Sequence, residues 1–130
     1  MTLKLTIDTR AWRDHVKHVH EEFPGLVPVA KGNGYGLGLD VLAREAERLN
    51  NDCLAVGTAH EVATVREAGW SRDVIVLGPW RPFDETATAL LDDPRVIIVV
   101  WQSKKRLRLS RKCHGKVASV RTCLEPAQST

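Results

Sequence analysis

Short apolar runs alternate with helix-forming segments along the first 100 residues of this 130-residue chain. The apolar runs have the length of strands, and the segments between them repeat apolar residues at helical steps. The expected strands are 3–7, 26–31, 53–57, 74–77 and 95–100, and the expected helices are 8–22, 38–49, 60–68 and 84–91. Alternation of this kind with short connections favours a parallel sheet, so the expected class is α/β.

Two of these segments carry clear signals. In 8–22, Asp8 stands where a helix cap is expected, and apolar residues recur at four- and three-residue steps from Trp12 to Phe23. In 95–100, five consecutive apolar residues follow the first position. That pattern is typical of a parallel strand buried on both faces.

The segment 29–38 points to chemistry. Lys31 follows an expected buried strand, and four glycines stand at every second position from Gly32 to Gly38. In α/β proteins ligands bind at the carboxyl ends of the strands. A lysine amine that is shielded from water can attack a carbonyl carbon and form a Schiff base, and glycines let backbone N–H groups approach a ligand. The alternative reading is a surface lysine at the start of a flexible loop.

Two familiar glycine motifs do not fit this segment. The spacing G-x-G-x-x-G fails because Leu37 or Leu39 falls where the third glycine is needed. A P-loop is excluded because the chain contains no G-K-[ST] sequence. The segment is therefore neither of the usual nucleotide-binding loops.

The same segment resembles the pyridoxal 5'-phosphate (PLP) signature of the alanine racemase family, written roughly apolar-V-K-A-[ND]-A-Y-G-H-G. Lys31 matches the Schiff-base lysine, Asn33 the amide or acid position, and Tyr35 the tyrosine of the Tyr-Gly pair. The chain departs from the pattern with glycine at 32 and 34 and leucine at 37. These departures indicate a divergent branch and leave the exact amino-acid substrate open.

Flanking segments extend the resemblance from residue 3 to about 101. Residues 5–8 resemble the family's opening strand and helix cap, and 52–62 resembles G-A-x-x-F-A-V-A-x-x-x-E-A. Residues 65–69 match L-R-x-A-G, and 74–78 match the next strand. The ordered series makes a chance match improbable.

The resemblance implies a TIM-type barrel followed by a β-rich C-terminal domain. A (β/α)₈ barrel takes about 250 residues. Residues 1–101 would therefore form a partial TIM-type (β/α) barrel of about four β-α units with parallel strands. The resemblance also implies an alanine racemase-like, PLP-binding protein, whose intact family is an amino-acid racemase (isomerase) that converts L-alanine to D-alanine. Lys31 would be the catalytic, cofactor-bound lysine, and Tyr35 would lie near the cofactor phosphate.

The second base of the family is a tyrosine from the C-terminal domain of a partner subunit. Tyr35 is the only tyrosine in this chain and belongs to the cofactor motif. The family's arginine at the pyridine nitrogen also falls beyond the matched segment. We therefore expect the isolated chain to be incomplete and inactive alone. The alternative class is a non-catalytic truncated remnant or a regulatory PLP-binding module.

Charge changes sharply near residue 101. Residues 1–100 carry a net charge of −4, whereas 101–130 carry +7 with Glu125 as the single acid. A reading-frame change or truncation at this point would explain a basic tail at 102–130 that does not resemble the family. A fifth strand at 116–120 and a cationic helix are alternatives. Nucleic-acid binding is disfavoured because no aromatic stacking platform accompanies the charge.

The remaining expectations concern location and partners. The chain has no apolar run of about 18 residues and no secretory h-region, so no membrane contact is expected. Three cysteines without a C-x-x-C pair fit a reduced cytoplasm. No metal site is expected, because solvated helix residues explain His15 and His18 better. The strand 95–100 would expose an unpaired edge, which favours a homodimer, covering by the tail, or aggregation.

Overall fold

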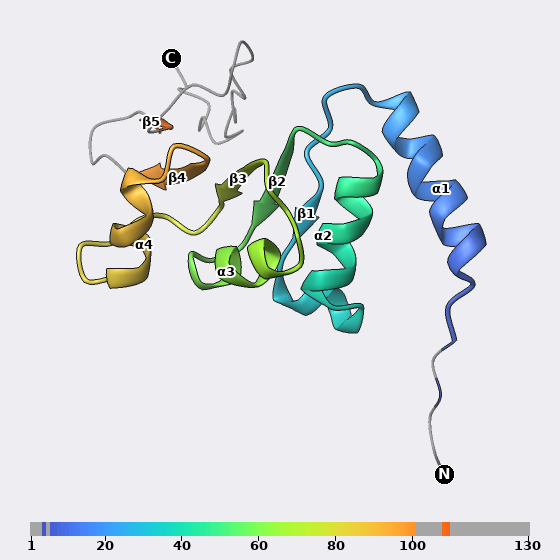
Figure 1. The fold of residues 1–130 in the computed structure, drawn as a ribbon, viewed down its shortest axis with the longest axis horizontal. Coiled ribbons are helices and arrows are strands. Elements are labelled where there is room, and N and C mark those ends of the chain that lie inside the picture. Colours follow the sequence, from blue (N-terminus) through green and yellow to red (C-terminus); the bar gives the residue numbers. More distant parts are fainter. Residues whose placement is uncertain (1–3, 5, 101–107, 110–130) are drawn as a thin grey trace, which may run out of the picture.

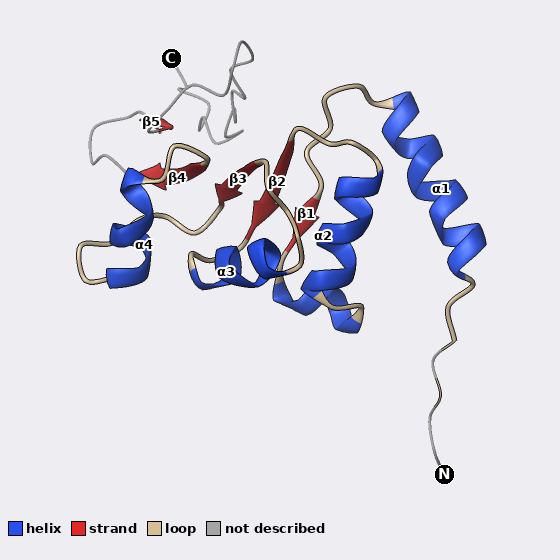
Figure 2. Cartoon of the chain, in the orientation of Figure 1, coloured by secondary structure: helices blue, strands red, loops and turns tan. Residues whose placement is uncertain are grey.

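The computed structural model describes residues 4, 6–100 and 108–109. The strands are β1 (Val29–Ala30), β2 (Cys53–Val56), β3 (Asp73–Val76), β4 (Val96–Val100) and β5 (Arg108–Leu109). The helices are α1 (Thr9–Glu22), α2 (Leu39–Arg48), α3 (His60–Glu67) and α4 (Glu85–Ala89), with short 3₁₀ segments at Gly32–Gly36 and Leu90–Asp92 (Figures 1 and 2).

Strands β1 to β4 form a parallel sheet in chain order. Ala30 is opposite Val56, and Val76 is opposite Ile98. A helical segment connects each strand to the next, which places all four carboxyl ends at one edge of the sheet. The expected α/β class and the partial TIM-type barrel are confirmed.

The core lies between the sheet and the helices that cover it. The largest fully buried side chains are Trp70, Leu54, Ile98, Val56, Val65, Val74 and Val76. The indole Nε1–H of Trp70 donates to the carbonyl of Asp73 at 3.1 Å, so this large ring is buried with its polar atom satisfied. Val96, Ile97 and Ile98 are all buried, which confirms that β4 is covered on both faces.

The sequence prediction was wrong at two places near the amino end. Residues 4, 6 and 7 of the expected strand 3–7 lie outside any strand, and Ile7 is exposed. A strand needs a partner, and within the described residues β1 has β2 as its one neighbour. The expected strand 26–31 is reduced to β1 because Pro28 has no N–H, although its carbonyl still accepts from Ala55 at 2.9 Å.

Helix α1 begins as predicted but lies loosely on the body. The side chain of Asp8 accepts from the backbone N–H groups of Arg10 and Ala11, both at 3.0 Å. The helix lies outside α2, away from the strands (Figure 1), and none of its residues is buried. An apolar hollow of about 80 Å³, lined by Trp12, Val16 and Leu42 among others, remains between it and the body.

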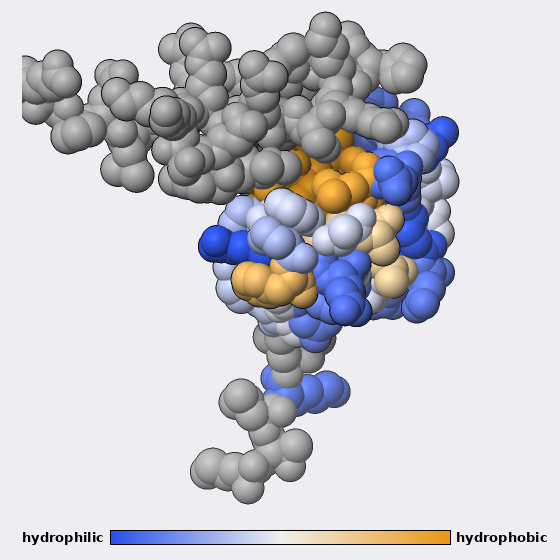
Figure 3. Space-filling view, turned by 90° about the vertical axis from the view of Figure 1, so that its left-hand side faces the viewer, coloured by the Kyte–Doolittle hydropathy of each residue, from blue (hydrophilic) through white to orange (hydrophobic). Residues whose placement is uncertain are grey.

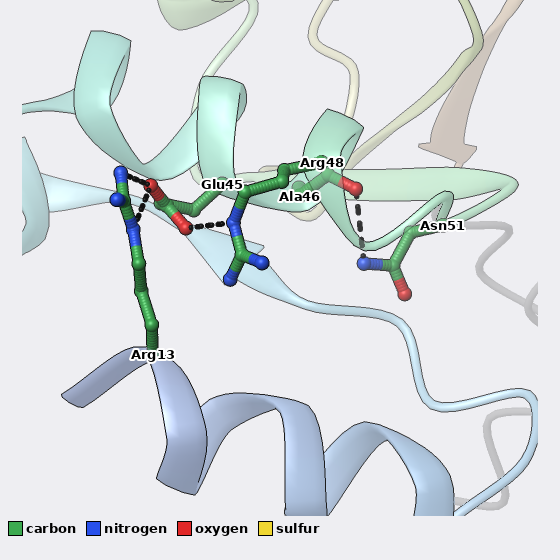
Figure 4. A network of polar contacts seen from close by, with 5 residues as sticks. All are labelled: Arg13, Glu45, Ala46, Arg48 and Asn51. Atoms are coloured by element: carbon green, nitrogen blue, oxygen red, sulfur yellow. Dashed lines mark hydrogen bonds and ion pairs between the residues drawn. The ribbon is translucent and has the colours of Figure 1, made fainter. Parts of the chain in front are cut away.

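A carboxylate on α2 ties α1 to this body. Glu45 accepts from Nε of Arg13 on α1 at 2.9 Å and from Nε of Arg48 at 2.7 Å (Figure 4). Burial by itself would raise the pKa of Glu45, but the hydrogen bonds and charges of the two arginines outweigh it and lower the pKa. Nearby, the Asn51 side chain donates to the carbonyl of Ala46 at 3.2 Å. The tie is made by side chains alone.

The far edge of the sheet is partly covered. β5 pairs antiparallel with β4, with Val99 opposite Leu109 and Val100 opposite Arg108. Covering by the tail, one of the three outcomes expected for this edge, is thus seen over two residues. Figure 3 shows that hydrophobic residues still gather on this side of the molecule. The alternative strand 116–120 lies outside the described residues. Among those that are described, no helix has the length and apolar character needed to cross a membrane.

Candidate functional site

Lys31 immediately follows β1, at the carboxyl edge of the sheet. It lines an open hollow of about 350 Å³ together with Gly32, Tyr35, Gly57, Thr58 and Glu61. Lys31 is exposed, which agrees with the alternative of a surface lysine at the start of a loop and not with an amine shielded from water. The reason is local: among the described strands β1 lies at the edge of the sheet, and the turn after it leaves the hollow open. None of the ion pairs within the described residues includes Lys31.

The turn after Lys31 has an unusual backbone. Gly32, Asn33, Gly34 and Tyr35 have φ between +54° and +58°, so four consecutive residues are left-handed. Residues with a side chain rarely adopt this backbone conformation, and glycine at positions 32 and 34 avoids its steric cost. At Gly34 a Cβ would come within 2.5 Å of Leu42 Cδ1. The family's alanine therefore does not fit at position 34 of this fold without movement of Leu42.

Tyr35 is one of the residues that line this hollow. Its surface is 99% exposed, and its backbone φ of +54° is uncommon for a bulky residue. Lys31 and Tyr35 border the same hollow, and their cofactor-binding roles stay predictions. Within the described residues, no hydrogen bond orients the phenol group of Tyr35.

Glu61, in the first turn of α3, connects the two loops that border the hollow. One carboxylate oxygen accepts from the N–H of Gly32 at 3.0 Å. The other accepts from the N–H groups of Gly57 at 2.7 Å and Thr58 at 2.9 Å. Glu61 was not among the site residues predicted from the sequence. The available signals were the acid in the 52–62 motif and its place at a helix start.

The loops after β2 and β3 are in direct backbone contact. Gly78 N–H donates to the carbonyl of Gly57 at 2.8 Å, and a Cβ at Gly78 would lie 2.7 Å from that same oxygen. A Cβ at Gly57 would lie 3.2 Å from Lys31 Cβ. The loops after β1, β2 and β3 are therefore closely packed at Gly57 and Gly78.

The histidines of α1 lie elsewhere. His15 and His18 are exposed, and His18 pairs with Glu22 on its own helix at 3.7 Å. Within the described residues, no group of three metal-ligating side chains comes together.

Comparison with known proteins agrees with the motif and the fold. The family model described as alanine racemase, N-terminal domain, matches residues 7–125. That match extends past the domain boundary expected at residue 101, which stays a prediction. No solved structure matches the chain.

Several alanine racemases are similar to the chain in sequence. The enzyme of Citrifermentans bemidjiense is 34% identical over 115 residues, which are 85% of this chain and 30% of the relative. Alanine racemase of Listeria monocytogenes is 33% identical over 123 residues, covering 88% and 33%. That of Geobacillus stearothermophilus is 32% identical over 100 residues, covering 75% and 25%. The chain spans about a third or less of the length of these relatives. Its motif, its parallel sheet and the family match together show that this chain belongs to the alanine racemase N-terminal domain family.

Proposed function

We propose that this chain binds PLP covalently through the side-chain amine of Lys31, with Tyr35 beside the cofactor phosphate. The observation that carries the proposal is the hollow at the carboxyl ends of β1 and β2, which both residues border. Membership of a PLP-dependent family adds independent support.

The residues around the hollow fit such a group. Its volume is about 350 Å³, and a Cβ added at Gly32 or Gly36 would meet nothing within 4 Å. The backbone is therefore open to a bulky ligand on this side. When bound, PLP supplies an electron sink for charge that develops on the substrate Cα. The part of Lys31 would be to hold the cofactor and to carry a proton on its Nζ.

Selective labelling tests the cofactor assignment. The purified chain is incubated with PLP, reduced with borohydride and mapped by mass spectrometry. We expect the adduct on Lys31 in preference to the exposed Lys17, and we expect Lys31→Arg to abolish it while Lys17→Arg leaves it unchanged. Labelling spread evenly over exposed lysines would contradict the proposal.

The proposed reaction is racemisation of a small amino acid, L-alanine to D-alanine, by a longer or completed polypeptide. Tyr35 is the only tyrosine here, so the isolated chain offers no tyrosine as a second base. A positioned acid–base group contributes roughly 10²–10⁴-fold to a rate. We therefore expect no appreciable D-alanine from the chain alone, assayed after purification from a host without racemases. Robust turnover would show that this view is wrong. The alternative, a non-catalytic remnant or regulatory PLP-binding module, predicts PLP binding with no turnover even after the barrel is completed.

We also propose that residues 102–130 are a basic tail produced by a frameshift or truncation of a racemase gene. The downstream DNA, read in all three frames, separates the alternatives. Recovery of a C-terminal racemase domain in another frame is the expected result, and a downstream sequence without such a domain contradicts it. We also propose a cytoplasmic location, because three cysteines without a C-x-x-C pair fit a reducing compartment.

A homodimer is the proposed assembly. β1 has no second neighbour among the described strands, and hydrophobic residues gather on the β4 side (Figure 3). Unpaired strand edges and apolar surface favour self-association. Sedimentation of the purified chain is expected to show a dimer or larger species, and a monomer with a cooperative thermal transition would contradict it.

A further inference from the structure

Glu61 makes a connection that its helix does not require. Its Oε2 accepts from Gly57 and Thr58, which lie just before α3, and this contact resembles ordinary capping of a helix start. Its Oε1 instead reaches Gly32, 29 residues earlier in the chain and on the loop after β1. One carboxylate thus holds two separate loops together.

The two loops are the ones that define the position of Lys31. Gly32 follows Lys31 directly, so its hydrogen bond to Glu61 restrains the backbone beside the lysine. On the other side, the Lys31 Cβ lies against Gly57, where an added Cβ would be 3.2 Å away. The Cα–Cβ direction of Lys31 is therefore bounded on both sides by groups that Glu61 binds.

The Glu61 carboxylate accepts hydrogen bonds from backbone amides and forms no ion pair with the Lys31 amine. Glu61 and Lys31 border the same hollow, yet no ion pair of 4.0 Å or less joins them. The three backbone donors occupy both oxygens of Glu61. An amine without a carboxylate partner stays available for a carbonyl ligand.

We infer that Glu61 is a positioning residue for Lys31, acting through the backbone of Gly32 and Gly57. This inference rests on the proposed function, in which Lys31 carries the cofactor. A glutamine at this position has one acceptor oxygen and an NH₂ group that only donates. Glu61→Gln can therefore hold one loop at most and must leave the other amide without its partner.

The matched control lies on the same helix. Glu67 is exposed near the end of α3, and Glu67→Gln makes the same chemical change away from the hollow. The full chain is used for both variants, with far-UV circular dichroism to verify that each is folded. Amide hydrogen exchange of Gly32, Gly57 and Thr58 is followed by NMR without PLP. The share of borohydride-trapped PLP on Lys31, relative to Lys17, is then measured in each variant.

We expect Glu61→Gln to speed exchange at Gly32 or at the Gly57 and Thr58 pair by about two- to tenfold, the range for one net hydrogen bond. The Lys31 share of the adduct should fall by a similar factor, and Glu67→Gln should change neither quantity. If Glu61→Gln does not fold, Glu61→Asp keeps the carboxylate on a side chain one methylene shorter and is expected to lower the Lys31 share.

The outcomes separate the two proposals. Wild-type chain without preference for Lys31 overturns the proposed function, whatever the exchange data show. Wild-type preference for Lys31 that persists unchanged in Glu61→Gln overturns the positioning role alone. Faster amide exchange with unchanged labelling would make Glu61 a helix cap and nothing more, and would likewise overturn the inference.

Discussion

Two glutamates join separate parts of this molecule in different ways. Glu45 receives its hydrogen bonds from the guanidinium groups of Arg13 and Arg48 (Figure 4), whereas Glu61 receives three from backbone N–H groups. The first holds a peripheral helix, and the second holds the loops that border Lys31. A tie made through long side chains leaves its two ends room to move, but a tie to the backbone fixes the chain itself.

The surroundings of the two ties differ in the same direction. The side chains of Arg13 and Arg48 are 47% and 41% exposed, and an apolar hollow lies under α1. Around Glu61, the backbone of Gly57 is in contact with that of Gly78, and a Cβ at Gly78 would lie 2.7 Å from the Gly57 oxygen. Substitutions at the strand ends should therefore lower the free energy of unfolding more than substitutions at the contact between α1 and α2.

The largest effect is expected from Gly78→Ala. The new Cβ would lie 2.7 Å from the carbonyl oxygen of Gly57, and a backbone atom cannot rotate away as a side chain can. Overpacking of this kind typically costs about 1–3 kcal/mol. Urea unfolding of the variant measures the loss, and PLP trapping at Lys31 should weaken in parallel.

Gly57→Ala is the internal comparison for that variant. Its Cβ would meet Glu61 Oε2 at 3.0 Å and Lys31 Cβ at 3.2 Å, so the Glu61 side chain and the backbone that carries Lys31 must each shift by a few tenths of an ångström. A smaller loss of stability than for Gly78→Ala is expected. A larger loss for Gly57→Ala than for Gly78→Ala would show that the loop after β3 adjusts to an added Cβ more easily than the backbone beside Lys31.

A smaller effect is expected from Glu45→Gln. The variant loses the charge that pairs with two half-exposed arginines, which costs about 1 kcal/mol. Because this contact lies away from the hollow beside Lys31, the share of PLP trapped on Lys31 should stay that of the wild type. Urea unfolding and labelling on the same preparation test both statements, and altered labelling would mean that α1 and the site are coupled.

The smallest effect is expected in the pH dependence of the unfolding free energy at acidic pH. The pKa of Glu45 is lower in the folded chain than its ordinary value, so its contribution is complete above the unfolded pKa and is lost as pH falls through the folded one. The difference in unfolding free energy between wild type and Glu45→Gln should therefore shrink below about pH 4. A constant difference down to strongly acidic pH would contradict the ion-pair account.

Much of the fold could be predicted from local patterns. The helix expected at 60–68 is α3 (His60–Glu67), and the strand expected at 95–100 is β4 (Val96–Val100). Helical spacing and continuous apolar runs depend on neighbours in the sequence, so they can be read without a structure. The strand expected at 3–7 failed because a strand is defined by a partner, which a local pattern cannot provide.

In the candidate site, too, some features follow from neighbouring residues and others only from contacts between distant segments. Lys31, Tyr35 and the glycines between them are contiguous, and their order alone identified the motif and the family. The exposure of Lys31 and the left-handed backbone of Asn33 and Tyr35 became visible only in the folded chain. The bond from Glu61 to Gly32 is of the same kind, because it joins residues 29 positions apart.

The sequence by itself therefore determined the alternation of strands and helices, the cap at Asp8 and the residues of the cofactor motif. Each of these is encoded within a few neighbouring positions. The tertiary structure decided which strand lies at an edge, how open the hollow beside Lys31 is, and which carboxylate holds the loops around it. Those features arise where distant segments meet, and packing of the parallel sheet brings the ends of β1, β2 and β3 together.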